Sequence, residues 1–201
     1  MTNQSEAESL SFLLRFEKKG LIRYISHLDL YRCFTRAFKR AKLPIWYTQG
    51  FNPHMKLVFS SPLSIGAQSV CEYLDLSMQG DISCEEIMER LNREVTDELR
   101  ITKAYIAERK FSDIMWADYT INVFTDGAGE ELAANIENLF ATAPLNMIKS
   151  TKSGEKEIDI IPLVKSVRAW FDKEKGTVVI KARLSANSSS VSPGKATIIS
   201  V

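Results

Sequence analysis

The sequence predicts an α+β protein built from two ferredoxin-like halves of the βαββαβ type in tandem, the second of them irregular or truncated. Two observations lead to this fold. In the first half, apolar patterns of strand and helix period follow one another in the order β-α-β-β-α-β, which is the ferredoxin-like order. The second half begins with the same strand, helix and strand and then departs from the pattern. We therefore expect two domains, residues 1–110 with the basic motif region and residues 111–201, irregular or incomplete at its C-terminus.

The first half is defined by clear start and stop signals. Aliphatic and aromatic residues predict a strand over 10–16, and Lys18-Lys19-Gly20 predicts a turn before an extended segment over 21–25. A helix over 27–42 begins after the N-cap Ser26 and ends before Pro44. The remaining expected elements are a structured loop over 44–56, strands over 57–59, 70–78 and 101–107, and an amphipathic helix over 83–98.

The second half repeats this beginning after a connection over 111–115. Its expected elements are strands over 119–125, 145–150 and 158–161, a helix over 129–141, a turn at 153–154, and a hairpin of strands over 164–171 and 177–184. The Ser-rich tail over 185–201 starts a helix at Pro193 and ends, which indicates an early stop.

Composition favours a globular protein of the reducing cytoplasm. Of 201 residues, 45% are hydrophobic and 25% charged, which excludes disorder as the dominant state. The three cysteines form no Cys-x-x-Cys pair, which argues against a disulfide framework and a structural zinc site. The chain has no secretory signal pattern and no apolar run of about 20 residues, so we expect no membrane partner. We also expect no bound metal or cofactor.

The charges of the chain are strongly segregated although its net charge is only +1. Residues 15–56 carry a net charge of +8 and contain both histidines, whereas residues 72–98 carry a net charge of −7. A chain of this kind can present a basic face to a polyanion. The alternative is that the two blocks pair with each other across the fold.

The first predicted helix separates its apolar and basic residues onto two faces. Its core stripe consists of Leu30, Phe34, Ala37, Phe38 and Ala41. Its cations, Arg32, Arg36, Lys39 and Arg40, fall largely on another face. One side of this helix is therefore expected to be buried and the other to be cationic.

A set of short motifs carries a family resemblance over roughly residues 14–76. These motifs are Arg23-Tyr24-Ile25-Ser26-His27-Leu28-Asp29-Leu30, Arg36-Ala37, Arg40-Ala41-Lys42-Leu43-Pro44, Gly50-Phe51-Asn52-Pro53-His54-Met55-Lys56 and Ser61-Pro62-Leu63-Ser64-Ile65-Gly66. The chain thereby resembles a radical-SAM-linked bacterial protein family of unknown function, whose members occur alone or as the C-terminal domain of radical-SAM proteins. The resemblance implies a radical-SAM partner and an RNA or ribosome context, with no established reaction.

The leading functional hypothesis is an RNA-binding accessory module that presents tRNA or rRNA to a radical-SAM partner. Its expected RNA-binding residues are Arg23, Arg32, Arg36, Lys39, Arg40, Trp46, Tyr47, Phe51, Asn52 and Lys56. Cations contact phosphates and loop aromatics stack on unpaired bases, so RNA is expected and DNA is not. No Cys-x-x-x-Cys-x-x-Cys cluster is present, so the partner must supply the iron–sulfur centre.

Two other functions remain open. The first is a metal-independent RNA-cleaving or RNA-modifying enzyme with His27 and His54 as acid and base, because the only two histidines both fall inside the motifs. The second is a protein-docking adaptor whose loop over 49–61 contacts the partner enzyme.

Overall fold

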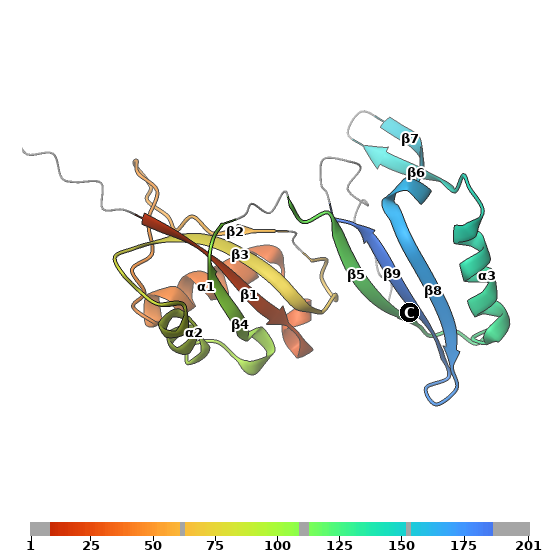
Figure 1. Cartoon of the computed structure of the whole chain (residues 1–201), viewed down its shortest axis with the longest axis horizontal. Helices are drawn as coiled ribbons and strands as arrows, with labels where there is room; N and C mark the ends of the chain where they lie inside the picture. Colours follow the sequence, from red (N-terminus) through yellow and green to blue (C-terminus); the bar gives the residue numbers. More distant parts are fainter. Residues whose placement is uncertain (1–8, 61–62, 109–112, 152–153, 187–201) are drawn as a thin grey trace, which may run out of the picture. The chain divides into compact units, whose positions relative to one another are not determined.

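The computed structural model describes residues 9–60, 63–108, 113–151 and 154–186. The chain divides into two compact units, Met1–Phe111 and Ser112–Val201. Each unit combines helices with antiparallel strands, which confirms the predicted α+β class (Figure 1).

The first unit contains one four-stranded antiparallel sheet with the strand order β2-β3-β1-β4. Its elements are β1 (Ser9–Lys18), α1 (His27–Arg40), β2 (Val58–Phe59), β3 (Ser69–Gln79), α2 (Cys84–Asn92) and β4 (Ile101–Ile106). This is the β-α-β-β-α-β order predicted for the first half.

The core of the first unit lies on one face of this sheet. Alternate residues of the two central strands are buried because successive side chains of a strand point to opposite faces. The buried set comprises Phe12, Leu14 and Phe16 of β1, Leu74, Leu76 and Met78 of β3, Leu30, Phe34, Ala37 and Phe38 of α1, and Ile87 and Leu91 of α2. Both helices therefore cover the same face, and the predicted apolar stripe of α1 is confirmed.

Three phenylalanines join β1, α1 and β2 inside this core. The ring of Phe16 lies 4.9 Å from that of Phe34, and the ring of Phe59 lies 6.0 Å from Phe16 and 5.7 Å from Phe34. The rings meet edge to face, the arrangement that aromatic quadrupoles favour. Strand β2 is thereby fastened to the sheet and to α1, although it has only two residues.

Two local predictions for the first unit are wrong. The segment after β1 is a 3-10 helix, η1 (Gly20–Tyr24), instead of extended chain, because Gly20 takes a φ of 54° and turns the backbone. The helix expected over 83–98 ends earlier, at Asn92. The Asn92 side-chain amide donates to the Ile101 carbonyl and its oxygen accepts from the Ile101 amide, both at 2.9 Å, so the chain returns to the sheet.

The second unit has a different topology. Its elements are β5 (Trp116–Val123), α3 (Glu130–Ala141), β6 (Asn146–Thr151), β7 (Gly154–Asp159), η4 (Ile161–Leu163), β8 (Val164–Asp172) and β9 (Thr177–Ser185). Three strands form a sheet in the order β5-β9-β8, against which α3 packs. In the described part of the unit, β6 and β7 form a separate two-stranded sheet. The predicted tandem of two ferredoxin-like halves is therefore not confirmed.

Some expectations concern residues outside the described ranges. They include the tail over 187–201 and parts of the connection over 111–115 and of the turn at 153–154. Among the described residues, no helix is long and apolar enough to cross a membrane.

A buried lysine and a partly buried carboxylate lie close to each other where β1 meets β3. Lys18 is only 2% exposed, and its ammonium donates to the Arg23 carbonyl at 3.4 Å. Burial raises the pKa of Glu72 to about 7, although a hydrogen bond from Ser69 and the charge of Lys18 oppose this shift. Burial likewise lowers the pKa of Lys18, against the attraction of Glu72.

Glu72→Gln should remove part of the pH dependence of stability. The native state holds the Glu72 proton up to a pKa of about 7, against 4.5 for an ordinary glutamate, so the free energy of unfolding falls as pH rises between these values. We expect the variant to match the wild type near pH 4 and to be more stable at pH 8, by at most about 3.5 kcal/mol, since one pKa unit is about 1.4 kcal/mol. Urea unfolding at both pH values measures this; identical pH profiles would contradict it.

Phe34→Ala should destabilise the first unit by about 3–5 kcal/mol, because it opens a cavity between β1, α1 and β2. Urea unfolding followed by circular dichroism measures the loss. Leu28→Ala, at an exposed position of the same helix, is the control and should change stability by less than about 0.5 kcal/mol. Equal losses for both variants would show that the phenylalanine contacts do not hold the unit together.

Candidate functional site

The start of α1 is fixed by a side-chain cap. The hydroxyl of Ser26 accepts a hydrogen bond from the Asp29 amide at 3.1 Å and donates to the Asp29 carboxylate at 2.7 Å. The Ser26 hydroxyl, followed by Arg32, lowers the pKa of Asp29. Ser26 therefore caps the helix, and Asp29, its capping-box partner, orients Arg32, 3.0 Å away.

The four cations of α1, here called the α1 cationic face, are all exposed: Arg32, Arg36, Lys39 and Arg40. Arg32 pairs with Asp29, and the Arg40 guanidinium lies 2.8 Å from the Glu94 carboxylate. Within the described part of the chain, Arg36 and Lys39 make no ion pair. These two side chains keep their full charge available to an outside anion.

The acidic block leaves most of this face uncovered. Arg40 to Glu94 is the only ion pair that joins the basic and acidic blocks among the described residues. Arg90 and Arg93 instead pair with Glu86 and Glu89 of their own helix, at the i,i+4 spacing that suits such pairs. Mutual pairing of the two blocks therefore accounts for one cation of α1 and does not account for Arg36 and Lys39.

The segment between α1 and β2 is a small hairpin, here called the aromatic loop (residues 45–57). Ile45 bridges to Met78 of β3, and Tyr47 bridges to Met55 within the loop. The Tyr31 hydroxyl of α1 donates to the Met55 carbonyl at 2.7 Å. The aromatic loop is thus tied both to the sheet and to the flank of α1.

The aromatic side chains of this loop are exposed to different degrees. Phe51 is fully exposed, Tyr47 is 38% exposed and Trp46 is partly buried. A fully exposed phenylalanine at a loop tip gains nothing from the fold of its own unit, which makes it a candidate contact for a ligand.

The remaining expected contact residues lie around the same elements. Arg23 sits 4.6 Å above the ring of Tyr24, next to the start of α1. Asn52 and Lys56 are exposed in the aromatic loop, and Lys56 faces the carboxylate of Asp75, whose pKa is raised mainly by burial.

The two histidines lie in different surroundings. The ring of His27 packs edge-on against Phe59 at 5.1 Å, whereas the ring of His54 hydrogen-bonds the Thr48 hydroxyl at 3.1 Å. In the described structure no hydrogen bond or ring contact joins the two imidazoles. The same described residues include no group of three or more His, Cys, Asp or Glu side chains that could hold a metal ion.

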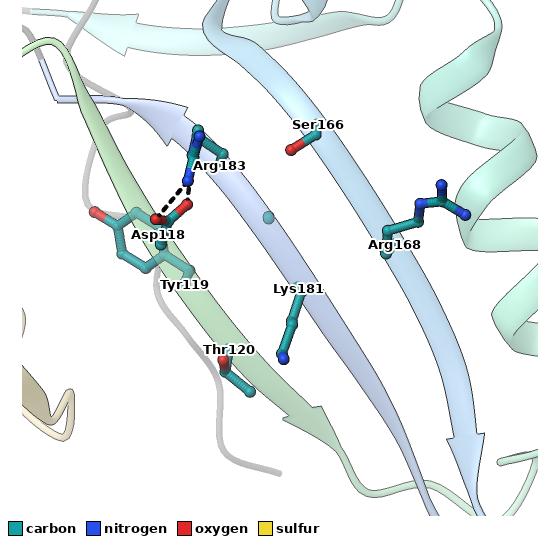
Figure 2. Close-up of a pocket in the computed structure, with 8 residues that line it drawn as sticks. Asp118, Tyr119, Thr120, Ser166, Arg168, Lys181 and Arg183 are labelled. Carbon is teal, nitrogen blue, oxygen red and sulfur yellow. Dashed lines mark hydrogen bonds and ion pairs between the residues drawn. The ribbon is translucent and has the colours of Figure 1, made fainter.

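A second group of cations, which was not among the expected binding residues, lies in the second unit. Arg168 of β8 and Lys181 and Arg183 of β9 line a hollow of about 500 Å³, together with Asp118 and Thr120 of β5 (Figure 2). These cations could have been found in the sequence from the alternation of basic and apolar residues, which places the basic side chains of each strand on one face. The pairing of β5 with β9, some 65 residues apart, was not visible in that pattern.

Comparison with known proteins identifies a family that covers most of the chain. No curated protein matches the sequence. The model of a family described as "Uncharacterized protein conserved in bacteria (DUF2344)" matches residues 12–193, which covers nearly all of both units. The chain therefore belongs to this conserved bacterial family.

Proposed function

We propose that this protein is a cytoplasmic RNA-binding accessory protein that presents a tRNA or rRNA substrate to a radical-SAM partner enzyme. The observation that carries the proposal concerns two exposed cations, Arg36 and Lys39, which pair with no acid among the described residues. They lie on a helix to which the aromatic loop is tied.

The two parts of this surface suit different parts of a nucleic acid. Arg36 and Lys39 have no ion pair with a described residue that RNA would have to break, so contact with phosphates releases counterions at little cost. Phe51 and Tyr47 offer ring faces to bases, and a base can stack on them only if it is unpaired. This combination favours single-stranded or looped RNA over duplex DNA.

The partner follows from the family resemblance and from the cysteines of this chain. Cys33, Cys71 and Cys84 lie too far apart in the sequence to form the cluster-binding motif of a radical-SAM enzyme. In the proposed complex, the partner supplies the iron–sulfur chemistry and this protein supplies the contacts to RNA.

The positions of the histidines favour this accessory role over an RNA-processing enzyme. A general acid and a general base must both reach the reacting group. His27 is held against Phe59 and His54 against Thr48, without a contact between them. The adaptor function is the second candidate, because the exposed ring of Phe51 would also suit a protein partner.

Arg36→Ala combined with Lys39→Ala should weaken RNA binding and flatten its dependence on salt. Each cation lost from a phosphate contact lowers the slope of log Kd against log salt by about 1, so we expect a change of about 2. Filter binding of total tRNA across a salt series measures it.

Arg93→Ala combined with Arg100→Ala is the matched control for that experiment. It removes the same charge from exposed arginines that pair with Glu89 and Asp97. The control should keep the wild-type slope. If both double variants have the same RNA affinity and the same salt slope, the α1 cationic face is not an RNA site.

Phe51→Ala should lower affinity for single-stranded RNA by roughly 1–3 kcal/mol, the value of one base stacked on an aromatic ring. The salt slope should stay unchanged, because no charge is lost. Leu139→Ala, an exposed apolar residue of α3, serves as the control and should leave the affinity as it was. Unchanged RNA affinity for Phe51→Ala would instead favour the adaptor function of the loop.

A further inference from the structure

The sheet of the second unit has one apolar face and one polar face. Side chains of the apolar face include Val123 of β5, Val178 and Ala182 of β9 and Phe171 of β8, and α3 packs on β8 and β9. The register places every second residue of the same strands on the opposite face. That opposite face contains the hollow shown in Figure 2.

Cations and tryptophans are arranged in rows across this polar face. The two middle rows are Asp118, Arg183 and Ser166, then Thr120, Lys181 and Arg168. Trp116 lies opposite Ser185 beyond the first of these rows, and Trp170 lies opposite Val179 beyond the second. The two tryptophan rows are six residues apart along β9, which corresponds to about 20 Å.

Each tryptophan already has a cation above its ring. The Lys165 ammonium is 5.4 Å from the ring centre of Trp116, and the Lys181 ammonium is 5.6 Å from that of Trp170. Groups that bind phosphate and groups that stack on bases therefore sit side by side. Trp170 is 40% exposed, so its ring is open to a ligand.

An ordinary solvated sheet face would show mixed charges and few large aromatic rings. Here four cations, Lys165, Arg168, Lys181 and Arg183, share the face with the carboxylates of Asp118 and, at the end of β8, Asp172. Asp172 pairs with Lys175 of the turn. Asp118 binds Arg183 in a two-pronged pair at 2.7 and 2.9 Å, and Arg183 in turn lowers the pKa of Asp118. Among the described residues, Arg168 and Lys181 make no ion pair.

We propose that this polar face is a second binding surface for single-stranded RNA, in which Trp116 and Trp170 stack on unpaired bases and Arg168 and Lys181 contact phosphates. The inference rests on the proposed function for its ligand, RNA. It adds a second place of contact and the single-stranded form of the RNA bound there. Stacking of unpaired bases on aromatic side chains of a sheet is an established form of single-stranded RNA recognition.

Intrinsic tryptophan fluorescence tests this surface separately from the first unit. In Trp46→Phe protein, the remaining tryptophans are Trp116 and Trp170, both on the polar face. Titration with dodecauridylate should quench their emission. Adding Arg168→Ala and Lys181→Ala to this protein should raise the Kd about tenfold and lower the salt slope by about 2.

The matched control carries Lys173→Ala and Lys175→Ala, which remove the same charge from the turn between β8 and β9. Its Kd should stay within about twofold of the Trp46→Phe protein, because its lysines contact no phosphate. Unaltered urea midpoints for both double variants show that the unit remains folded. Absence of quenching, or equal weakening by the two double variants, would overturn the inference.

The same titration separates this inference from the proposed function of the first unit. If Arg36→Ala with Lys39→Ala weakens binding and Arg168→Ala with Lys181→Ala does not, the α1 surface stands and the second surface is refuted. If only Arg168→Ala with Lys181→Ala weakens binding, the second surface stands and the α1 surface is refuted. Loss in both double variants supports two surfaces on one RNA.

Discussion

The contact among Phe16, Phe34 and Phe59 is the constraint on which the first unit depends. These rings belong to β1, α1 and β2, three elements whose backbones could otherwise be placed in many ways. The ring contacts fix the buried side of α1, and the opposite side, with Arg36 and Lys39, must then face outward. They also anchor the chain just beyond the aromatic loop, so that Phe51 projects from a segment held at both of its ends.

Ion pairs within the first unit determine which of the outward-facing cations of α1 already have an acidic partner. The acidic residues of α2 lie within the same unit as the cations of α1, yet they satisfy arginines of their own helix. Among the described residues, the one ion pair between the acidic block and a cation of α1 is that of Glu94 with Arg40. Exposed pairs of this kind contribute little to stability. Their effect is on which cations can bind an outside anion, because a cation that already pairs with an acid of this chain is less free to do so.

The parts of the fold that follow from local patterns could be predicted from the sequence. The apolar spacing of Leu30, Phe34 and Phe38 predicted the buried side of α1, and Ser26 predicted its first residue. The early end of α2 could not be predicted, because it depends on Asn92 meeting the backbone of Ile101 on another element. The sheet of the second unit depends likewise on pairing between distant segments, and local patterns do not contain that information.

The candidate site likewise has features that could be predicted from the sequence and features that could not. The cationic side of α1 is a property of one helix and was visible as a periodic pattern. The exposure of Phe51 and the partial burial of Trp46 follow from how their loop is bridged to β3 and Met55, which the aromatic composition alone did not distinguish. The cations of β8 and β9 form a group only after the strands have paired.

The shortness of β2 bears on how the first sheet avoids aggregation with other chains. A long, regular outer strand offers unpaired backbone groups to other chains and invites sheet-to-sheet aggregation. Here the aromatic loop interrupts the outer strand and leaves only Val58 and Phe59 in regular pairing with β3. The two-residue β2 therefore offers other chains only a small stretch of regular strand edge.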